Sequence, residues 1–313
     1  MSLCTCNENV KNFGQPNCVG ILERPQKLAF TYRLADDGTL NKITTSDTLD
    51  DTFFEGLINE SDLSKRLYPS PVINQVKDAR AEFNTFELDG FNIVTSQGVR
   101  TMAFTVVDGA SPQIAAAFNS MGCRDMAFYT WSINDQIGGN GSVAGELRPF
   151  RIKKGTMRAL YNPPSKVDET PAMVMVQFDL SDLEKDEDIA YINYGTGAND
   201  VQVNITDYTG LIDVVMGAAT NKTTTGFKVP IDLIYGSQLN KDPFQGAVAA
   251  DFSLAEVSPT PGAISITSVT EGTGANVGIY TFVIPTQTSA DVLRLTFSKT
   301  GYEASSTIDI TIP

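Results

Sequence analysis

Short runs of alternating apolar and polar residues occur along this chain of 313 residues, and they are clearest in its last third. Tyr280, Phe282 and Ile284 occupy every second position of one run, and similar runs cover residues 292–298 and 308–312. A period of two is that of a β-strand with one buried face. The pattern therefore predicts a series of short strands, spaced at roughly ten-residue intervals.

This spacing is typical of a β-sandwich, and residues 201–313 resemble bacterial immunoglobulin-like domains. Residues 226–235 and 247–257 are expected to be partner strands of the alternating runs. Lys299-Thr-Gly-Tyr302 lies between the last two strands and supplies the glycine that a tight turn needs. Fibronectin-like and jelly-roll modules have similar spacing, so both remain alternatives.

The first two thirds of the chain combine such runs with two segments that have helical features. Leu49–Leu67 has acidic residues early and basic residues late, as the helix dipole favours, and Tyr68-Pro-Ser-Pro71 follows it. Ser111 as the N-cap, Pro112 in the first turn and Gly122 as the terminator predict a second, shorter helix.

Asp125–Ile133 has large apolar residues on both sides of the alternation, which predicts a strand buried on both faces. Further strands are expected at residues 28–34, 40–44, 83–94, 98–107, 147–153, 156–161 and 172–179. We therefore expect a mainly β protein. Its N-terminal domain would be an antiparallel β-sandwich or barrel-like structure with one or two packed helices, and an immunoglobulin-like β-sandwich would follow.

The composition changes from mixed to almost purely β near the glycine-rich segment Tyr194–Asn199. This change predicts a β-rich domain over residues 1–195, with an irregular N-terminal arm at residues 1–26, and a second domain over residues 196–313. A chain of this length exceeds the usual size of a single core, so two domains are expected.

The formal net charge of the chain is -14. A surface of this charge repels phosphate backbones, so we do not expect the protein to grip nucleic acid. A surface along which DNA slides without adhering remains compatible with it. The absence of a basic and apolar leader and of a long apolar run predicts a protein made in a cytoplasm, without a membrane span.

The sequence contains no histidine, which excludes Ser-His-Asp and Cys-His catalysis and histidine-ligated metals. The glycine-rich segment Gly138–Gly145 matches neither a phosphate-binding loop nor a nucleophile elbow. It is expected to be a mobile surface loop, or alternatively an arm that orders against a neighbouring subunit. No pair of carboxylates is singled out by its spacing, and we expect no enzymatic activity and no cofactor.

Two groups of residues are weak metal candidates. Cys4, Cys6, Cys18 and Cys123 lack the paired spacing of a zinc site, so free reduced thiols are the favoured interpretation. The acidic segment Asp179–Asp188 lacks the central glycine of a calcium loop, so a solvated turn or short capped helix is expected there.

The segment Cys6–Cys18, the block Gly98–Phe104 and Gly122-Cys-Arg-Asp125 before an aromatic strand resemble virion structural proteins of bacteriophages that infect Bacteroidetes-type bacteria. The layout of the whole chain is similar to that of tail-tube proteins of long-tailed phages. This resemblance implies identical subunits that pair strand edges into rings, and stacked rings around a DNA channel with an acidic lumen. Cys4–Cys18 and Gly138–Gly145 would be assembly segments.

The same resemblance implies location in the virion, contacts with other virion proteins, and an outward immunoglobulin-like domain that touches host-surface glycans weakly and repeatedly. Two alternatives remain. The chain could be a capsid decoration or head-fibre protein, or it could be a surface adhesin or carbohydrate-binding module.

Overall fold

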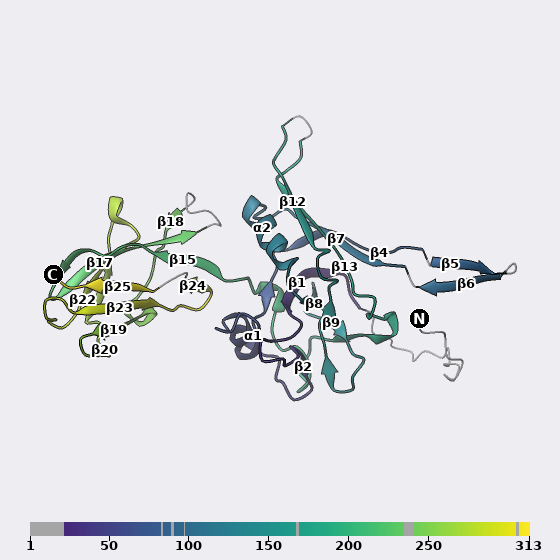
Figure 1. Ribbon diagram of the computed structural model, residues 1–313, viewed down its shortest axis with the longest axis horizontal. Coiled ribbons are helices and arrows are strands. Elements are labelled where there is room, and N and C mark those ends of the chain that lie inside the picture. Colours follow the sequence, from purple (N-terminus) through teal and green to yellow (C-terminus); the bar gives the residue numbers. More distant parts are fainter. Residues whose placement is uncertain are drawn as a thin grey trace. The chain divides into compact units, whose positions relative to one another are not determined.

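The computed structural model describes residues 22–82, 84–88, 91–96, 98–166, 169–234, 241–304 and 307–313. The chain divides into two compact units, Met1–Tyr208 and Thr209–Pro313 (Figure 1). The predicted fold class is confirmed, since antiparallel sheets dominate both units and the described residues contain two α-helices. Neither helix in this part of the chain has the length and apolar character needed to cross a membrane.

The first unit contains two main sheets. One has the strand order β14-β9-β8-β1-β3, with β11 also paired to β8. The other has the order β12-β13-β7-β4. Their strands are β1 (Pro25–Tyr32), β3 (Tyr68–Pro69), β4 (Ile73–Arg80), β7 (Arg100–Val106), β8 (Met126–Ser132), β9 (Ile137–Asn140), β11 (Phe150–Arg151), β12 (Arg158–Asn162), β13 (Met173–Asp179) and β14 (Ile189–Ile192).

Aromatic side chains from both sheets meet in one core. Phe128 of β8 lies 5.2 Å from Phe178 of β13, and Phe30 of β1 lies 6.2 Å from Phe178, measured between ring centroids. Alternation explains this contact, because Val174, Val176 and Phe178 of β13 are all buried while the residues between them face outward. The first unit is therefore a β-sandwich.

Helix α2 (Pro112–Met121) forms where the sequence predicts it. The Ser111 hydroxyl accepts a hydrogen bond from the Ile114 N–H at 3.3 Å, and Gly122 is the C-cap. Phe118 contacts Phe30 and Phe104, with centroid distances of 5.7 and 5.8 Å. The helix therefore belongs to the core between the two sheets.

All seven residues of β8 are buried, which confirms the prediction of a strand covered on both faces. Its second face packs against helix α1 (Asp51–Ile58), where Trp131 meets Phe54 at 6.0 Å. The predicted helix Leu49–Leu67 is wrong in its extent. It ends at Ile58 with Asn59 as the C-cap: the Asn59 N–H makes the last helical bond, to Glu55 O, the side-chain Nδ2 donates to the same carbonyl, and the ψ of 9° at Asn59 takes the backbone out of helical geometry.

The strand expected at residues 83–94 is instead a hairpin. It consists of β5 (Asn84–Leu88) and β6 (Phe91–Ser96), which pair with each other as a separate two-stranded sheet. Strand β4 precedes it and β7 follows it, so the four strands form one long arm (Figure 1). Two short strands, β2 (Ile43–Thr44) and β10 (Glu146–Leu147), form a small sheet elsewhere in this unit.

The second unit is the predicted immunoglobulin-like sandwich. One sheet has the order β21-β22-β17-β15-β24, with β16 and β18 also paired to β17, and the other has the order β20-β19-β23-β25. The usual letters of immunoglobulin-like strands can be assigned in chain order: A is β15, B is β17, C is β19, C′ is β20, D is β21, E is β22, F is β23 and G is β25. With these letters the two sheets have the orders D-E-B-A and C′-C-F-G, as in immunoglobulin-like domains.

The strands of this unit are β15 (Ile212–Met216), β16 (Thr220–Thr223), β17 (Gly226–Ile234), β18 (Lys241–Pro243), β19 (Phe252–Ser258), β20 (Gly262–Ile264), β21 (Ser268–Glu271), β22 (Ile279–Val283), β23 (Val292–Phe297), β24 (Tyr302–Ala304) and β25 (Ile308–Thr311). The side chains predicted to face inward are buried, namely Tyr280, Phe282, Ile284, Leu293, Leu295 and Phe297. Gly301 has the expected positive φ, 84°, in the turn before β24.

The unit boundary lies after Tyr208, not at the position between residues 195 and 196 that the composition predicts. Residues between these points pack on the first unit. Val201 and Ile205 are fully buried, and the buried ammonium of Lys27 donates to Tyr208 O at 2.8 Å. Burial lowers the pKa of Lys27, and the nearby Asp207 carboxylate partly offsets this effect. The composition therefore becomes β-rich near residue 195, whereas the chain still packs on the first unit as far as Tyr208.

We predict that Asp213→Asn stabilises the second unit at neutral pH. Asp213 of β15 is the register partner of Glu303 on the parallel strand β24. Partial desolvation, and secondarily the Glu303 charge, raise the pKa of Asp213, but its side chain is exposed and solvent screening keeps the energetic effect small. A carboxyl group with a raised folded-state pKa does not oppose folding below its unfolded-state pKa, where it is protonated in both states. As the pH rises through the folded-state pKa, its ionisation destabilises the folded state. Thermal unfolding should show a gain of about 0.2–1 kcal/mol at pH 7. The gain should vanish near pH 3, and a gain independent of pH would contradict this explanation.

Candidate assembly surfaces

The residues considered for catalysis or metal binding do not converge in the described part of the chain. Cys123 is an exposed free thiol, whereas Cys4, Cys6 and Cys18 lie outside the described residues. Within the described ranges, no group of three or more Cys, Asp or Glu side chains is arranged to hold a metal ion. The predicted arm at residues 1–26 lies mostly outside these ranges, and its residues 25 and 26 begin β1.

The glycine-rich segment Gly138–Gly145 is only partly a loop, which corrects the prediction. Its first three residues are buried in β9, between β8 and β14. A Cβ atom on Gly138 would lie 2.3 Å from Thr130 Oγ1, and one on Gly139 would lie 2.5 Å from Arg148 O. These glycines therefore permit close packing of backbones, a role that sequence spacing does not distinguish from a flexible loop.

The acidic segment Asp179–Asp188 is likewise only partly solvated. Its Asp186–Asp188 portion is a short 3₁₀ helix, as the prediction of a turn or short helix allows. Glu184, however, has a side chain that is only 3% exposed and pairs with Arg151 at 3.4 Å. Its carboxylate accepts from Asn140 Nδ2 at 2.6 Å and from Arg151 N at 3.2 Å. Glu184 thus joins the loop after β13 to β9 and β11.

One edge of the β12-β13-β7-β4 sheet is covered by the protein itself. The Asn119 side chain on α2 accepts from Ala159 N at 2.9 Å and donates to Ala159 O at 3.0 Å. An amide side chain thus replaces the neighbouring strand that β12 lacks. The backbone groups of Ala159 are therefore not available for pairing with another chain.

Two other end strands differ from β12: β4, at the opposite end of the same sheet, and β14, at one end of the other sheet. In the described residues, β4 pairs only with β7, and β14 pairs only with β9. Ala81 N donates to Val99 O at 2.9 Å. Because bonded and non-bonded pairs alternate in an antiparallel ladder, the N–H and C=O of Asp78 point away from β7. Such an edge can accept a further strand.

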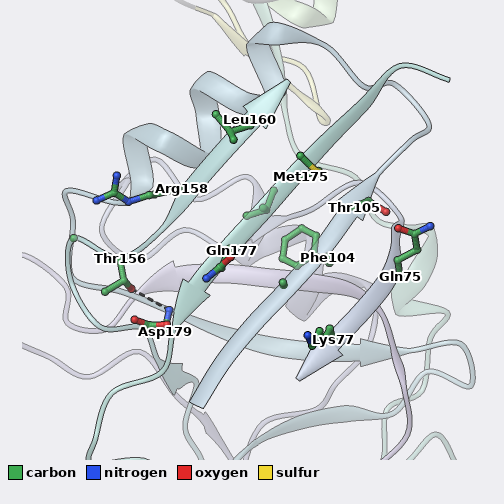
Figure 2. A pocket seen from close by; sticks show the side chains of 13 residues that line it. Gln75, Lys77, Phe104, Thr105, Thr156, Arg158, Leu160, Met175, Gln177 and Asp179 are labelled. Carbon is green, nitrogen blue, oxygen red and sulfur yellow. Dashed lines mark hydrogen bonds between the residues drawn. The ribbon is translucent and has the colours of Figure 1, made fainter. Parts of the chain in front are cut away.

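The outer face of the β12-β13-β7-β4 sheet has a hollow of about 620 Å³ (Figure 2). Figure 2 shows Leu160, Met175 and Gln177 standing on this face. The side chains of Leu160 and Met175 are 65% and 40% exposed, and both belong to the lining of this hollow. The hollow is lined by Gln75, Lys77, Ala103, Phe104, Thr105, Gly155, Thr156, Arg158, Leu160, Met175, Val176, Gln177 and Asp179.

The charge on this face is mixed, with Lys77 and Arg158 as bases and Asp179 as an acid among the lining residues. This face is therefore not the acidic surface expected of a DNA channel. Sequence reasoning missed both the hollow and strand β4, because residues 73–80 do not alternate. Gln75 in this strand has a φ of 50°, and the register with β7 shifts between Asn74 and Lys77. The bulge breaks the period of two on which the strand predictions depend.

Comparison with models of protein families found no match, and comparison with curated proteins found none either.

We predict that Gly138→Ala destabilises the first unit by about 1–3 kcal/mol, because the added methyl group must displace both the Thr130 and the Leu22 side chains. Gly56→Ala is the matched control. Gly56 is exposed in α1 and a Cβ there meets no atom within 4 Å, so this substitution should stabilise by about 0.5–1 kcal/mol. Chemical denaturation measures both. Equal effects of the two substitutions would show that close packing does not select Gly138.

A further prediction concerns Glu184. Glu184→Ala removes the acceptor for Asn140 and Arg151, and should cost about 1.5–3 kcal/mol in unfolding free energy. Asp182→Ala in the same segment removes a side chain that is 73% exposed, and should change stability by less than about 0.5 kcal/mol. Thermal unfolding of both variants tests the difference, which a purely solvated acidic segment would not produce.

Proposed function

We propose that this chain is a structural protein of a virion that works by self-assembly, with a phage tail-tube subunit as the first candidate. The observation that carries the proposal is the difference between the strand edges of the first unit. The edge at β12 is covered by Asn119, whereas β4 and β14 each pair on one side only.

Strands β4 and β14 are end strands of different sheets, so contact between β4 of one copy and β14 of the next would be head-to-tail. Such contacts generate closed rings or continuing filaments, depending on the rotation between copies. Main-chain hydrogen bonds would supply affinity, as in other cases of strand addition. Stacked rings would then enclose a channel through which DNA passes without specific binding.

The immunoglobulin-like unit would decorate such an assembly and contact host-surface glycans or other virion proteins. A repeated array favours this use, because many weak contacts gain avidity from their number. The high negative charge of the chain, -14, also suits passage of DNA, since like charges prevent adhesion. A capsid decoration protein with the same two units is the second candidate, and the regular two-sheet sandwich of unit two is the observation that favours it.

We predict that the purified protein forms rings or tubules of uniform width in negative-stain microscopy. Asp78→Pro should reduce their formation, because proline removes the outward N–H of β4 without removing a bond to β7. The matched control is Asp78→Ala, which loses only the ion pair with Arg100 at 2.5 Å and should still assemble.

Thermal unfolding should confirm that both variants are folded. Assembly of Asp78→Pro to the same extent as Asp78→Ala would exclude the β4 edge. A monodisperse monomer at all concentrations of the unmodified protein would contradict self-assembly and favour the decoration protein.

A further inference from the structure

The outer face of the β12-β13-β7-β4 sheet carries its side chains in rows that the register fixes. Arg158 of β12 is the partner of Gln177 of β13. Gln177 is in turn the partner of Ala103 of β7, which is paired with Lys77 of β4. Because cross-strand partners lie on the same face of a sheet, these residues form one row across all four strands, with Gln177 between the two bases (Figure 2). The small side chain of Ala103 leaves this polar row low on β7, in the lining of the hollow.

An apolar row lies beside the polar one. Leu160 and Met175 are cross-strand partners, and each is two positions along its strand from a member of the polar row, on the same face. Both side chains are exposed, and both line the hollow. A ligand in the hollow would therefore meet hydrogen-bonding groups along one side and apolar groups along the other.

The polar side chains of the lining divide into two groups. Some are already bonded within the chain. The Asp179 carboxylate accepts from Thr101 Oγ1 at 2.7 Å, and Thr156 Oγ1 donates to Lys153 O at 2.7 Å. The others have no hydrogen-bond or ion-pair partner for their side chains within the described ranges, namely Gln75, Lys77, Arg158 and Gln177. These four side chains are the ones available to a ligand.

The available groups donate far more hydrogen bonds than they accept. The Lys77 ammonium and the Arg158 guanidinium are donors only, whereas each of the two amides both donates and accepts. The lining contains one acid, Asp179, against these two bases, so positive charge is in excess there. The hollow therefore matches a ligand that is negatively charged, is rich in oxygen acceptors and offers hydroxyl groups to the amides.

Nucleic acid fits this description less well than an acidic saccharide does. Two bases neutralise few phosphates, and the chain as a whole has a net charge of -14. Unpaired nucleotides are usually held by exposed aromatic rings, but the one aromatic residue of the lining, Phe104, is only 2% exposed. Leu160 and Met175 instead provide an aliphatic surface against which the C–H groups of a sugar ring can lie.

We propose that this hollow on the first unit binds an acidic oligosaccharide. Acidic groups of the ligand meet Arg158 and Lys77, and its hydroxyl groups bond to Gln177 and Gln75. The two bases stand three strand spacings apart, about 14 Å, so a ligand that reaches both is longer than one sugar ring. The volume of about 620 Å³ lies within the usual range of small-molecule sites, roughly 300–1,000 Å³. The site lies within one copy of the chain, so the inference does not depend on self-assembly.

Titration calorimetry at low ionic strength tests the class of ligand. Galacturonate trimers and hyaluronate tetramers should bind the two-unit chain, and added salt should weaken this binding. The methyl ester of the galacturonate trimer keeps the sugar rings and loses the charge, so it should bind at least about tenfold more weakly. Absence of binding by both acidic oligomers, or equal binding of the ester, would overturn the inference. Equal binding of a thymidine oligonucleotide would also overturn it, because charge alone would then explain the attraction.

Substitutions in the polar row locate the site. Lys77→Gln and Arg158→Gln should each weaken binding by about threefold to tenfold, and Gln177→Glu, which places a carboxylate between the two bases, by about tenfold or more. Lys222→Gln is the matched control, because Lys222 is exposed, belongs to the second unit and its replacement changes the net charge equally. The control should bind as the unmodified protein does, and thermal unfolding should show that all four variants are folded. Unchanged binding by the three row variants, or equal weakening by the control, would exclude the hollow as the site.

Discussion

The first unit depends on the burial of β8 on both of its faces. Phe128 on one side meets the aromatic cluster between the sheets, and Trp131 on the other meets Phe54 of α1. A strand with two buried faces takes part in two packing layers. A shift of its pairing register by one residue would exchange its two faces and move apolar side chains into the wrong layer. The position of β9, and hence the need for glycine beside it, follows from this fixed strand.

The covered and the open sides of the sandwich follow from the same packing. Helix α2 must bury Phe118 against Phe30 and Phe104, and this contact brings Asn119 to the backbone of Ala159. The helix thus protects one edge of the sheet as a consequence of filling the core. No comparable element is paired to the outer side of β4 in the described chain, and one side of the proposed assembly contact lies there.

Much of the fold could be predicted because local patterns and tertiary packing agree. Alternation gave the strands of the immunoglobulin-like unit, and the Ser111, Pro112 and Gly122 signals gave α2. The predictions failed where non-local contacts decide. The buried state of Glu184 depends on Asn140 and Arg151, and the unit boundary depends on Val201 and Lys27. The hollow could not be anticipated, because it joins residues from four strands whose order is not contained in any local pattern.

The two hydrogen bonds between the Asn119 side chain and the Ala159 backbone make the two ends of the sheet different from each other. Two copies cannot join through their sealed β12 ends, so this sheet offers another copy only its β4 end. An array built from β4-to-β14 contacts would be polar, with every member oriented alike. Its two extremities would be chemically different, so that growth could start at one and be terminated at the other by a different protein.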